Sequence, residues 1–240
     1  MAKIINAKKK FFGTDGIRGP ISSKTSPDFI LKLGWAAGEV FKDLGIKTFI
    51  IGKDTRISGY MLEAALQAGI ISSGLNVRLV GPLPTPAISY LVSTFKSQAG
   101  IVISASHNSY EDNGIKFFDD KGQKISDEIE LLIEQKISEE ITVVEPERLG
   151  KAARLNDASG RYIEYCKNSL SQQTSFAGLK IVLDTANGAA YDVAPKVFRE
   201  LGAEVVAISN NPDGLNINKN CGSTDLNFLK KAVLDSNACL

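Results

Sequence analysis

The sequence has very little histidine or cysteine, and this scarcity excludes several kinds of metal site. His107 is the only histidine among 240 residues, so zinc sites built from two or more histidines are excluded. The three cysteines form no C-x-x-C pair. An odd number of scattered cysteines is typical of reduced thiols, so we expect a cytoplasmic protein.

Long apolar segments and an excess of charge of one sign are also missing. The longest apolar runs, Thr48–Ile51 and Gly100–Ile103, have the length of strands and are too short to cross a bilayer. The 28 Lys and Arg residues nearly balance 27 Asp and Glu residues, which leaves a net charge of +1. We therefore expect no membrane partner and no nucleic-acid partner.

The sequence does contain alternating strand and helix patterns. Apolar runs predict buried strands at Thr48–Gly52 and Ala99–Ala105. Between them, the apolar spacing predicts a helix from Gly59 to Gly74 and a strand at Val77–Gly81, and an earlier helix is expected at Pro27–Leu44. This alternation favours an α/β fold with a mixed, mostly parallel sheet sandwiched by helices.

A change of composition suggests two domains. An amphipathic helix is expected at Asp127–Ile137, and the charged segment Ser138–Asp157 that follows has no strong periodicity. We interpret this segment as a connection and predict one domain over residues 1–155 and the start of a similar α/β domain over 156–240. In the second part we expect helices at 159–169, 190–201 and 225–234, and strands at 179–183 and 204–208.

A weak internal repeat relates the two parts. The segments that begin at Phe49–Asp54 and Lys180–Asp184 both have the order strand, aspartate loop, helix, glycine, strand. Duplication of one domain explains this order, and so does the general likeness of any two such units. Ala238–Leu240 is apolar, as if a further strand begins there, and we expect the second domain to be truncated.

The residues best suited to chemistry follow the second buried strand. Ser106, His107 and Asn108 come at its carboxyl end, where open α/β sheets bind their ligands, and Lys116 lies a few residues beyond. A hydroxyl, an imidazole, a carboxamide and an ammonium group suit the handling of a phosphoryl group. The alternative is a polar turn that only caps backbone groups. Because neighbouring strand residues face opposite sides, His107 is expected to be poorly placed to deprotonate Ser106.

Two glycine-rich loops are further candidates. In Phe12–Gly19, the amides around Gly13 and Thr14 can approach an oxyanion and Arg18 can bind phosphate, although a plain turn is the alternative. In the loop Gly52–Gly59 we expect Asp54 and Arg56 to form an ion pair that shapes the loop, with Ser58 capping the next helix.

Together these segments resemble a known enzyme family. Phe12–Gly19, Gly52–Gly59 and Gly100–Phe118 closely resemble the α-D-phosphohexomutases, and the sequences FGTDGIRG and ISASHN resemble the branch that acts on glucosamine phosphate. Leu33–Gly38 and Asn216–Ser223 are similar to that branch too. The resemblance extends in order through essentially the whole chain. One difference is Ser109, since family members commonly carry proline there.

The resemblance implies a phosphoserine mechanism. Ser106 would carry a phosphoryl group and pass it to glucosamine 6-phosphate, which gives a sugar 1,6-bisphosphate. That intermediate would reorient and return its other phosphoryl group to Ser106, releasing glucosamine 1-phosphate for peptidoglycan precursor synthesis. The residues implied to line the site are Gly13, Thr14, Arg18, His107, Asn108 and Lys116. Either Lys116 or His107 would handle the hydroxyl proton.

The resemblance also implies cofactors and partners. Mg²⁺ would bind the phosphoryl group of Ser106 and an aspartate-rich loop expected just beyond Leu240, and the 1,6-bisphosphate would act as activator. The resemblance also suggests a homodimer, which apolar surface on the first-domain helices could support. Two alternatives stay open: a mutase of the same family acting on glucose or mannose phosphates, and a fragment that binds phosphate without catalysis.

Overall fold

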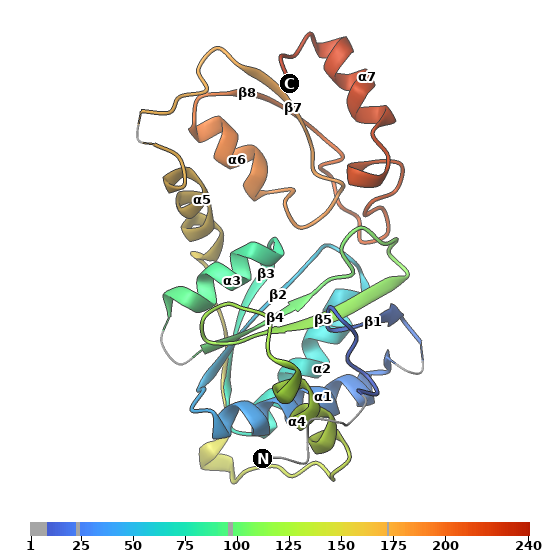
Figure 1. Ribbon diagram of the computed structural model, residues 1–240, viewed down its shortest axis with the longest axis vertical. Coiled ribbons are helices and arrows are strands. Elements are labelled where there is room, and N and C mark those ends of the chain that lie inside the picture. Colours follow the sequence, from blue (N-terminus) through green and yellow to red (C-terminus); the bar gives the residue numbers. More distant parts are fainter. Residues whose placement is uncertain (1–8, 23–24, 96–97, 172) are drawn as a thin grey trace.

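The computed structural model describes residues 9–22, 25–95, 98–171 and 173–240, which contain two β-sheets (Figure 1). The first sheet has six strands in the order β1-β5-β4-β2-β3-β6, and the second pairs β7 with β8. The strands are β1 (Ile17–Pro20), β2 (Thr48–Lys53), β3 (Asn76–Pro82), β4 (Gln98–Ile103), β5 (Asp112–Phe118), β6 (Ala152–Arg154), β7 (Lys180–Asp184) and β8 (Glu204–Ile208).

The first sheet is mixed and mostly parallel, as predicted. β2 pairs in parallel with β3 and β4, and β6 joins β3 in parallel. β5 runs antiparallel to β4, and β1 runs antiparallel to β5. The central strands β2 and β4 are buried on both faces, which explains their uninterrupted apolar sequences.

Helices cover both faces of this sheet. The helices are α1 (Pro27–Asp43), α2 (Ser58–Ser72), α3 (Thr85–Thr94), α4 (Asp127–Ile137), α5 (Ala158–Asn168), α6 (Val193–Glu200) and α7 (Asn227–Ser236). α1, α2 and α4 pack on one face, where Leu33 and Phe41 join the core with Ile101 (Figure 1). α3 packs on the other face, where Ile88 meets Val102. No helix in the described ranges combines the length and apolar character that a membrane crossing requires.

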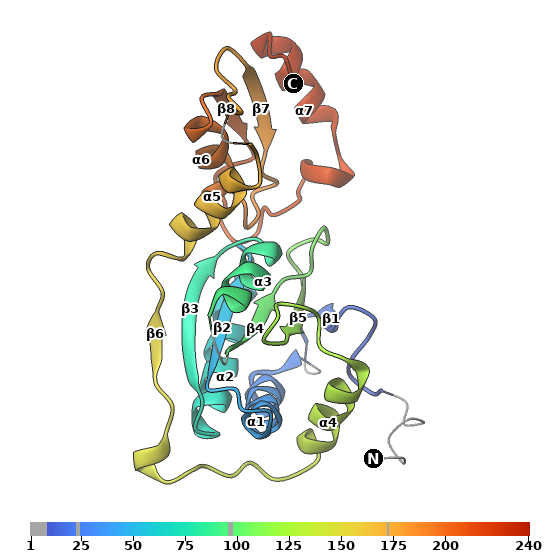
Figure 2. The same ribbon diagram turned by 60° about the vertical axis from the view of Figure 1, so that its left-hand side comes forward.

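The connection between the expected domains contributes to the first sheet. Ala152–Arg154 lies within the segment interpreted as a linker, yet it forms β6 along the outer edge of β3 (Figure 2). The three residues of β6 are exposed, so the sequence has no apolar pattern there from which a strand could be predicted. The domain boundary after residue 155 stays a prediction.

The two halves of the internal repeat have the same local topology. In each, two parallel strands flank a helix, as β2-α2-β3 and β7-α6-β8. Gly74 and Gly202 follow the two helices with φ of +95° and +99°, a left-handed conformation that favours glycine at a helix end. Whether duplication produced the likeness stays open. Near the carboxyl end, Cys239 N donates to Lys180 O at 2.9 Å, beside β7.

The second sheet meets the first through the loop after β2. The hydroxyl of Thr55 donates to the carbonyl of Asn187, and Ile57 N donates to Gly214 O at 2.9 Å. A second contact between the two parts of the chain is made by Tyr90 of α3, which stacks on Tyr165 of α5 with ring centroids 4.0 Å apart. The loop between β2 and α2 therefore touches both parts of the chain.

Candidate active site

Ser106 occupies a tight turn directly after β4. Its side chain is exposed, and its φ of +58° is left-handed, which is uncommon for a residue with a Cβ atom. The turn is closed by Ser106 N, which donates to Ser104 Oγ at 3.1 Å, and by Asn108 N, which donates to Ala105 O at 3.2 Å. The hydroxyl is thus displayed at the carboxyl edge of the sheet, where the sequence predicted it.

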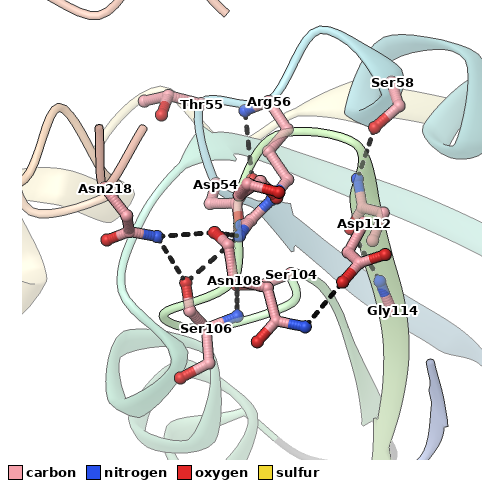
Figure 3. Close-up of polar contacts among 12 residues, drawn as sticks. Asp54, Thr55, Arg56, Ser58, Ser104, Ser106, Asn108, Asp112, Gly114 and Asn218 are labelled. Carbon is pink, nitrogen blue, oxygen red and sulfur yellow. Dashed lines mark hydrogen bonds and ion pairs between the residues drawn. The ribbon is translucent and has the colours of Figure 1, made fainter. Parts of the chain in front are cut away.

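Beneath this turn lies the guanidinium group of Arg56, which is completely buried. Its Nη2 donates to Ser106 O at 3.2 Å and to Asn108 O at 2.6 Å (Figure 3). Its Nε donates to Ser109 O at 3.3 Å. Its Nη1 pairs with the carboxylate of Asp54. The expected ion pair is confirmed, but the support that Arg56 gives to the Ser106 turn was not predicted.

Asn218 supports the same turn from the second part of the chain. Its Nδ2 donates to Ser106 O at 3.0 Å and to Asn108 O at 2.9 Å (Figure 3). Asn218 is itself left-handed, with φ of +58°. The sequence indicated Asn218 only as part of Asn216–Ser223, a segment similar to one branch of the family, and it predicted no contact between Asn218 and Ser106.

Neighbouring polar side chains fix the ends of the turn. Asn108 Nδ2 donates to Asp112 Oδ2 at 2.8 Å (Figure 3). Asn113 Nδ2 donates to Ser58 Oγ at 2.8 Å. The expectation that Ser58 caps a helix was wrong, because α2 starts at Ser58 itself and its cap position is Ile57, with no side-chain capping bond. The hydroxyl of Ser58 instead ties α2 to β5.

Ser106 and His107 together line an open cleft of about 540 Å³. Both side chains are exposed and lie in a turn, so the strand alternation used to separate them does not apply. The far wall comes from the second part of the chain. The other lining residues are Val182, Leu183, Asp184, Thr185, Ala186, Ala190, Asn218, Gly222, Ser223, Leu226 and Leu229. These residues include no lysine or arginine.

Arg18 and Lys116 meet at Asp15 and not at Ser106. Asp15 Oδ2 lies 3.1 Å from Arg18 Nη2 and 2.6 Å from Lys116 Nζ. Neither cation forms a hydrogen bond with Ser106 within the described ranges. In the sheet, Arg18 lies two strands from Ser104, because Arg18 pairs with Gly114 from one side while Ser104 N donates to Gly114 O from the other. Two strand spacings amount to about 10 Å.

The first glycine-rich loop is a tight turn beside these cations. Gly13 and Thr14 line a shallow pocket of about 210 Å³ together with Arg18. The amide of Gly13 donates to Gly16 O at 2.8 Å, so this amide serves the turn. At Gly16, φ is +85° and an added Cβ atom would lie 2.3 Å from Ile115 O. Binding of an anion by Gly13 and Thr14 stays a prediction.

The residues of the cleft do not form a magnesium site. The described part of the chain has no group of three or more His, Cys, Asp or Glu residues that could hold a metal ion. Asp184 is the one carboxylate that lines the cleft, and both of its oxygens accept backbone amides, from Ala186 N and Gly222 N at 2.8 Å each. Mg²⁺ prefers free carboxylates beside phosphate oxygens, and the cleft offers none.

Cys221, which adjoins the cleft residue Gly222, is buried with 2% of its surface exposed. Burial raises the pKa of its thiol. The nearby carboxylates of Asp184 and Asp225 raise this pKa further, whereas a hydrogen bond with Ser209 lowers it. The thiol is therefore protonated at neutral pH and is not a nucleophile. Ser106 is the more accessible nucleophilic group of the cleft.

The chain is similar in sequence to curated phosphoglucosamine mutases. The chain is 60% identical over 233 residues to a phosphoglucosamine mutase of Pseudomonas fluorescens (strain Pf0-1), which covers 97% of this chain and 52% of that protein. It is 59% identical over 231 residues to a phosphoglucosamine mutase of Pseudomonas savastanoi pv. phaseolicola, covering 96% of this chain and 52% of the relative. The chain thus spans about half the length of the curated relatives it matches.

Solved structures agree with the fold. A phosphoglucomutase/phosphomannomutase family protein from Burkholderia thailandensis matches 95% of this chain and 50% of its own, with a TM-score of 0.79 and 25% identity. A putative phosphomannomutase from Thermus thermophilus matches 87% of this chain and 47% of its own, with a TM-score of 0.74 and 29% identity. Residues 9–143 match the family described as phosphoglucomutase/phosphomannomutase, alpha/beta/alpha domain I. The chain therefore belongs to the phosphoglucomutase/phosphomannomutase family, the phosphohexomutases that its motifs resemble.

Proposed function

We propose that this chain carries the phosphoserine part of an enzyme that interconverts glucosamine 6-phosphate and glucosamine 1-phosphate. The observation that carries the proposal is the exposed Ser106 hydroxyl, held on a supported turn at the mouth of a cleft. The 60% identity to a phosphoglucosamine mutase favours the amino sugar. Since the chain spans half of that relative, the activity is proposed for the longer protein.

The proposed reaction moves one phosphoryl group in each of two steps. In the first, the bond between phosphorus and Ser106 Oγ breaks, a bond from phosphorus to the C1 hydroxyl oxygen of glucosamine 6-phosphate forms, and that hydroxyl loses its proton to a base. The Ser106 oxygen released in this step takes up a proton. In the second step the 1,6-bisphosphate has turned over: a bond from Ser106 Oγ to the C6 phosphorus forms as the bond between that phosphorus and the C6 oxygen breaks, Ser106 Oγ loses its proton, and the C6 oxygen takes up a proton to become a hydroxyl. The products are glucosamine 1-phosphate and the phosphoserine that began the cycle.

Charge determines the roles proposed for the polar residues. A phosphoserine carries about −1.5 to −2 charges and requires cations and donors around it. We propose that Arg18 and Lys116 exchange Asp15 for phosphate oxygens, which is chemically reasonable because the Asp15 side chain is 53% exposed and its ion pairs are weak. Asn108 would donate through the second hydrogen of its Nδ2 and Thr14 through its hydroxyl, while Gly13, whose amide donates to Gly16 O, would line the pocket beside them. Lys116 or His107 would accept the hydroxyl proton.

The proposal extends to cofactors and partners. Family members generally depend on a metal, and Mg²⁺ would neutralise charge on the transferring group. The described residues hold no carboxylate cluster for it, so its remaining ligands would have to lie outside them. Activation by a sugar 1,6-bisphosphate, a homodimer and a cytoplasmic location stay predictions.

Mapping the phosphoryl group tests the proposal. Protein isolated from cells, or treated with glucosamine 1,6-bisphosphate labelled in its phosphate, is expected to carry one phosphoryl group on Ser106. Ser106→Ala should abolish the label, whereas Ser109→Ala removes an exposed hydroxyl of the same turn and should keep it. A label that survives Ser106→Ala would contradict the proposal.

Turnover assays separate the two alternatives raised by the sequence. A mutase for glucose or mannose phosphates would convert those sugars faster than glucosamine 6-phosphate when they compete in one reaction. Measurable turnover by the 240-residue chain would reject the alternative that it is a fragment that only binds phosphate. In both comparisons, the turnover rate is expressed relative to the amount of phosphoserine mapped at Ser106.

A further inference from the structure

The turn that displays Ser106 is held through its carbonyl groups. Ser106 O accepts from Arg56 Nη2 at 3.2 Å and from Asn218 Nδ2 at 3.0 Å. Asn108 O accepts from the same two atoms, at 2.6 and 2.9 Å. Each carbonyl has two lone pairs, so both are fully used. In Figure 3 the Ser106 hydroxyl lies on the side of the residue opposite to these donors.

This arrangement compensates for an unfavourable backbone conformation. Ser106 has φ of +58°, in the left-handed region that residues with a Cβ atom rarely adopt. Such a conformation persists only where surrounding contacts determine it, and it is frequent at sites where a reactive group has to be held in one orientation. The four hydrogen bonds from Arg56 and Asn218 are contacts of that kind.

The two donors differ in how firmly they are anchored. Arg56 is completely buried and its charge is matched by Asp54, so its position is set by the core of the first sheet. Asn218 comes from a loop after β8, and its bonds to Ser106 exist only while the second part of the chain rests against the first. Arg56 is thus a fixed support and Asn218 a conditional one.

We propose that Arg56 and Asn218 are positioning residues for the Ser106 hydroxyl, and that Asn218 makes its orientation depend on contact between the two parts of the chain. This rests on the proposed function for its consequence in phosphoryl transfer, but the positioning itself is independent of it. Neither side chain has to touch a substrate. Their effect passes through the backbone of the turn.

Asn218→Ala is the decisive variant, and Asn220→Ala is its matched control. Asn220 is exposed, lies two residues away and is also left-handed, with φ of +55°. Both substitutions therefore introduce the same backbone strain, and they differ in the two bonds that only Asn218 donates to the turn. Arg56→Lys is a second variant, because lysine keeps the charge beside Asp54 but lacks the planar fork that reaches three carbonyls.

Hydrogen exchange of the amides of residues 104–109 measures the support directly. In Asn218→Ala these amides should exchange about tenfold faster than in Asn220→Ala, as expected for the loss of two hydrogen bonds. Arg56→Lys should accelerate the same amides. Equal exchange in Asn218→Ala and Asn220→Ala would overturn the proposal.

Labelling of Ser106 gives the second readout. At saturating glucosamine 1,6-bisphosphate, Asn218→Ala should label on the order of tenfold more slowly than Asn220→Ala, with little change in the half-saturating concentration. An effect confined to the half-saturating concentration would reject the positioning role in transfer. Faster exchange combined with no label in any variant, wild type included, would support the positioning and reject the mutase.

Discussion

Asp54 and Arg56 form an ion pair that solvent barely reaches, with side chains that are 4% and 0% exposed. A second contact joins the same two residues, because Arg56 N also donates to Asp54 Oδ1 at 3.0 Å. A buried guanidinium without a counter-charge is strongly unfavourable. Asp54 thus allows Arg56 to remain beneath the turn that carries Ser106.

Removing this counter-charge should destabilise the protein. We expect Asp54→Ala to lower the free energy of unfolding by about 3–5 kcal/mol, because a buried charge is left unpaired. Asp157→Ala is the control, since Asp157 and Arg161 form a pair whose side chains are 55% and 48% exposed. That loss should stay below about 1 kcal/mol. Urea unfolding of both variants checks the difference, and equal losses would refute it.

Two helical glycines should respond in opposite directions to alanine. Gly69 lies where α2 crosses α1, and an added Cβ atom would be 2.0 Å from Leu31 O and 2.6 Å from Trp35 N. Gly69→Ala should therefore destabilise the fold by about 2 kcal/mol or more. Gly160 in α5 has nothing within 4 Å of such an atom, so Gly160→Ala should stabilise it by about 0.5–1 kcal/mol. Thermal unfolding gives the sign of each change.

Asp15 should compete with phosphate for Arg18 and Lys116. Replacing its carboxylate by an amide removes the competitor, so Asp15→Asn should bind inorganic phosphate on the order of 2- to 5-fold more tightly than wild type. Asp120→Asn removes the same charge from another exposed position and should leave the affinity unchanged. Calorimetric titration with inorganic phosphate measures both. Equal affinities in the two variants would argue against the proposed exchange.

The thiols should differ sharply in reactivity. Cys239 is exposed, whereas Cys221 is buried and burial raises its pKa. At pH 8, alkylation followed by peptide mapping should modify Cys239 at least about 100-fold faster than Cys221. A raised pKa also means that the neutral thiol of Cys221 contributes stability below the ordinary cysteine pKa of about 8.5. That contribution is lost as the pH rises through the higher folded-state pKa.

A Cys221→Ala variant isolates this pH dependence. Urea unfolding of wild type should show a loss of stability above the ordinary cysteine pKa that the variant lacks. The sign follows from the thiolate, which the unfolded chain solvates better than the buried site does. An identical alkaline loss in both proteins would contradict the assignment to Cys221.

The sequence predicted the elements in which apolar and polar residues recur with a regular period. The helix expected at Asp127–Ile137 has those bounds, and the strand expected at Glu204–Ile208 does too. β1 and β5 were missed, because glycine, asparagine, arginine and lysine interrupt their apolar pattern. These two strands form through their neighbours in the sheet, and propensity within a short window does not report that pairing.

By itself, the sequence determined the α/β fold and the family and predicted Ser106 as the reactive residue, because these follow from local periodicity and from motifs of contiguous residues. Only the tertiary structure decided which groups surround that hydroxyl. Arg56 and Asn218 lie 50 and 112 residues from Ser106 along the chain, and Arg18 and Lys116 meet at Asp15. Contacts across such separations depend on how the sheets and loops pack, and no spacing in the sequence encodes them.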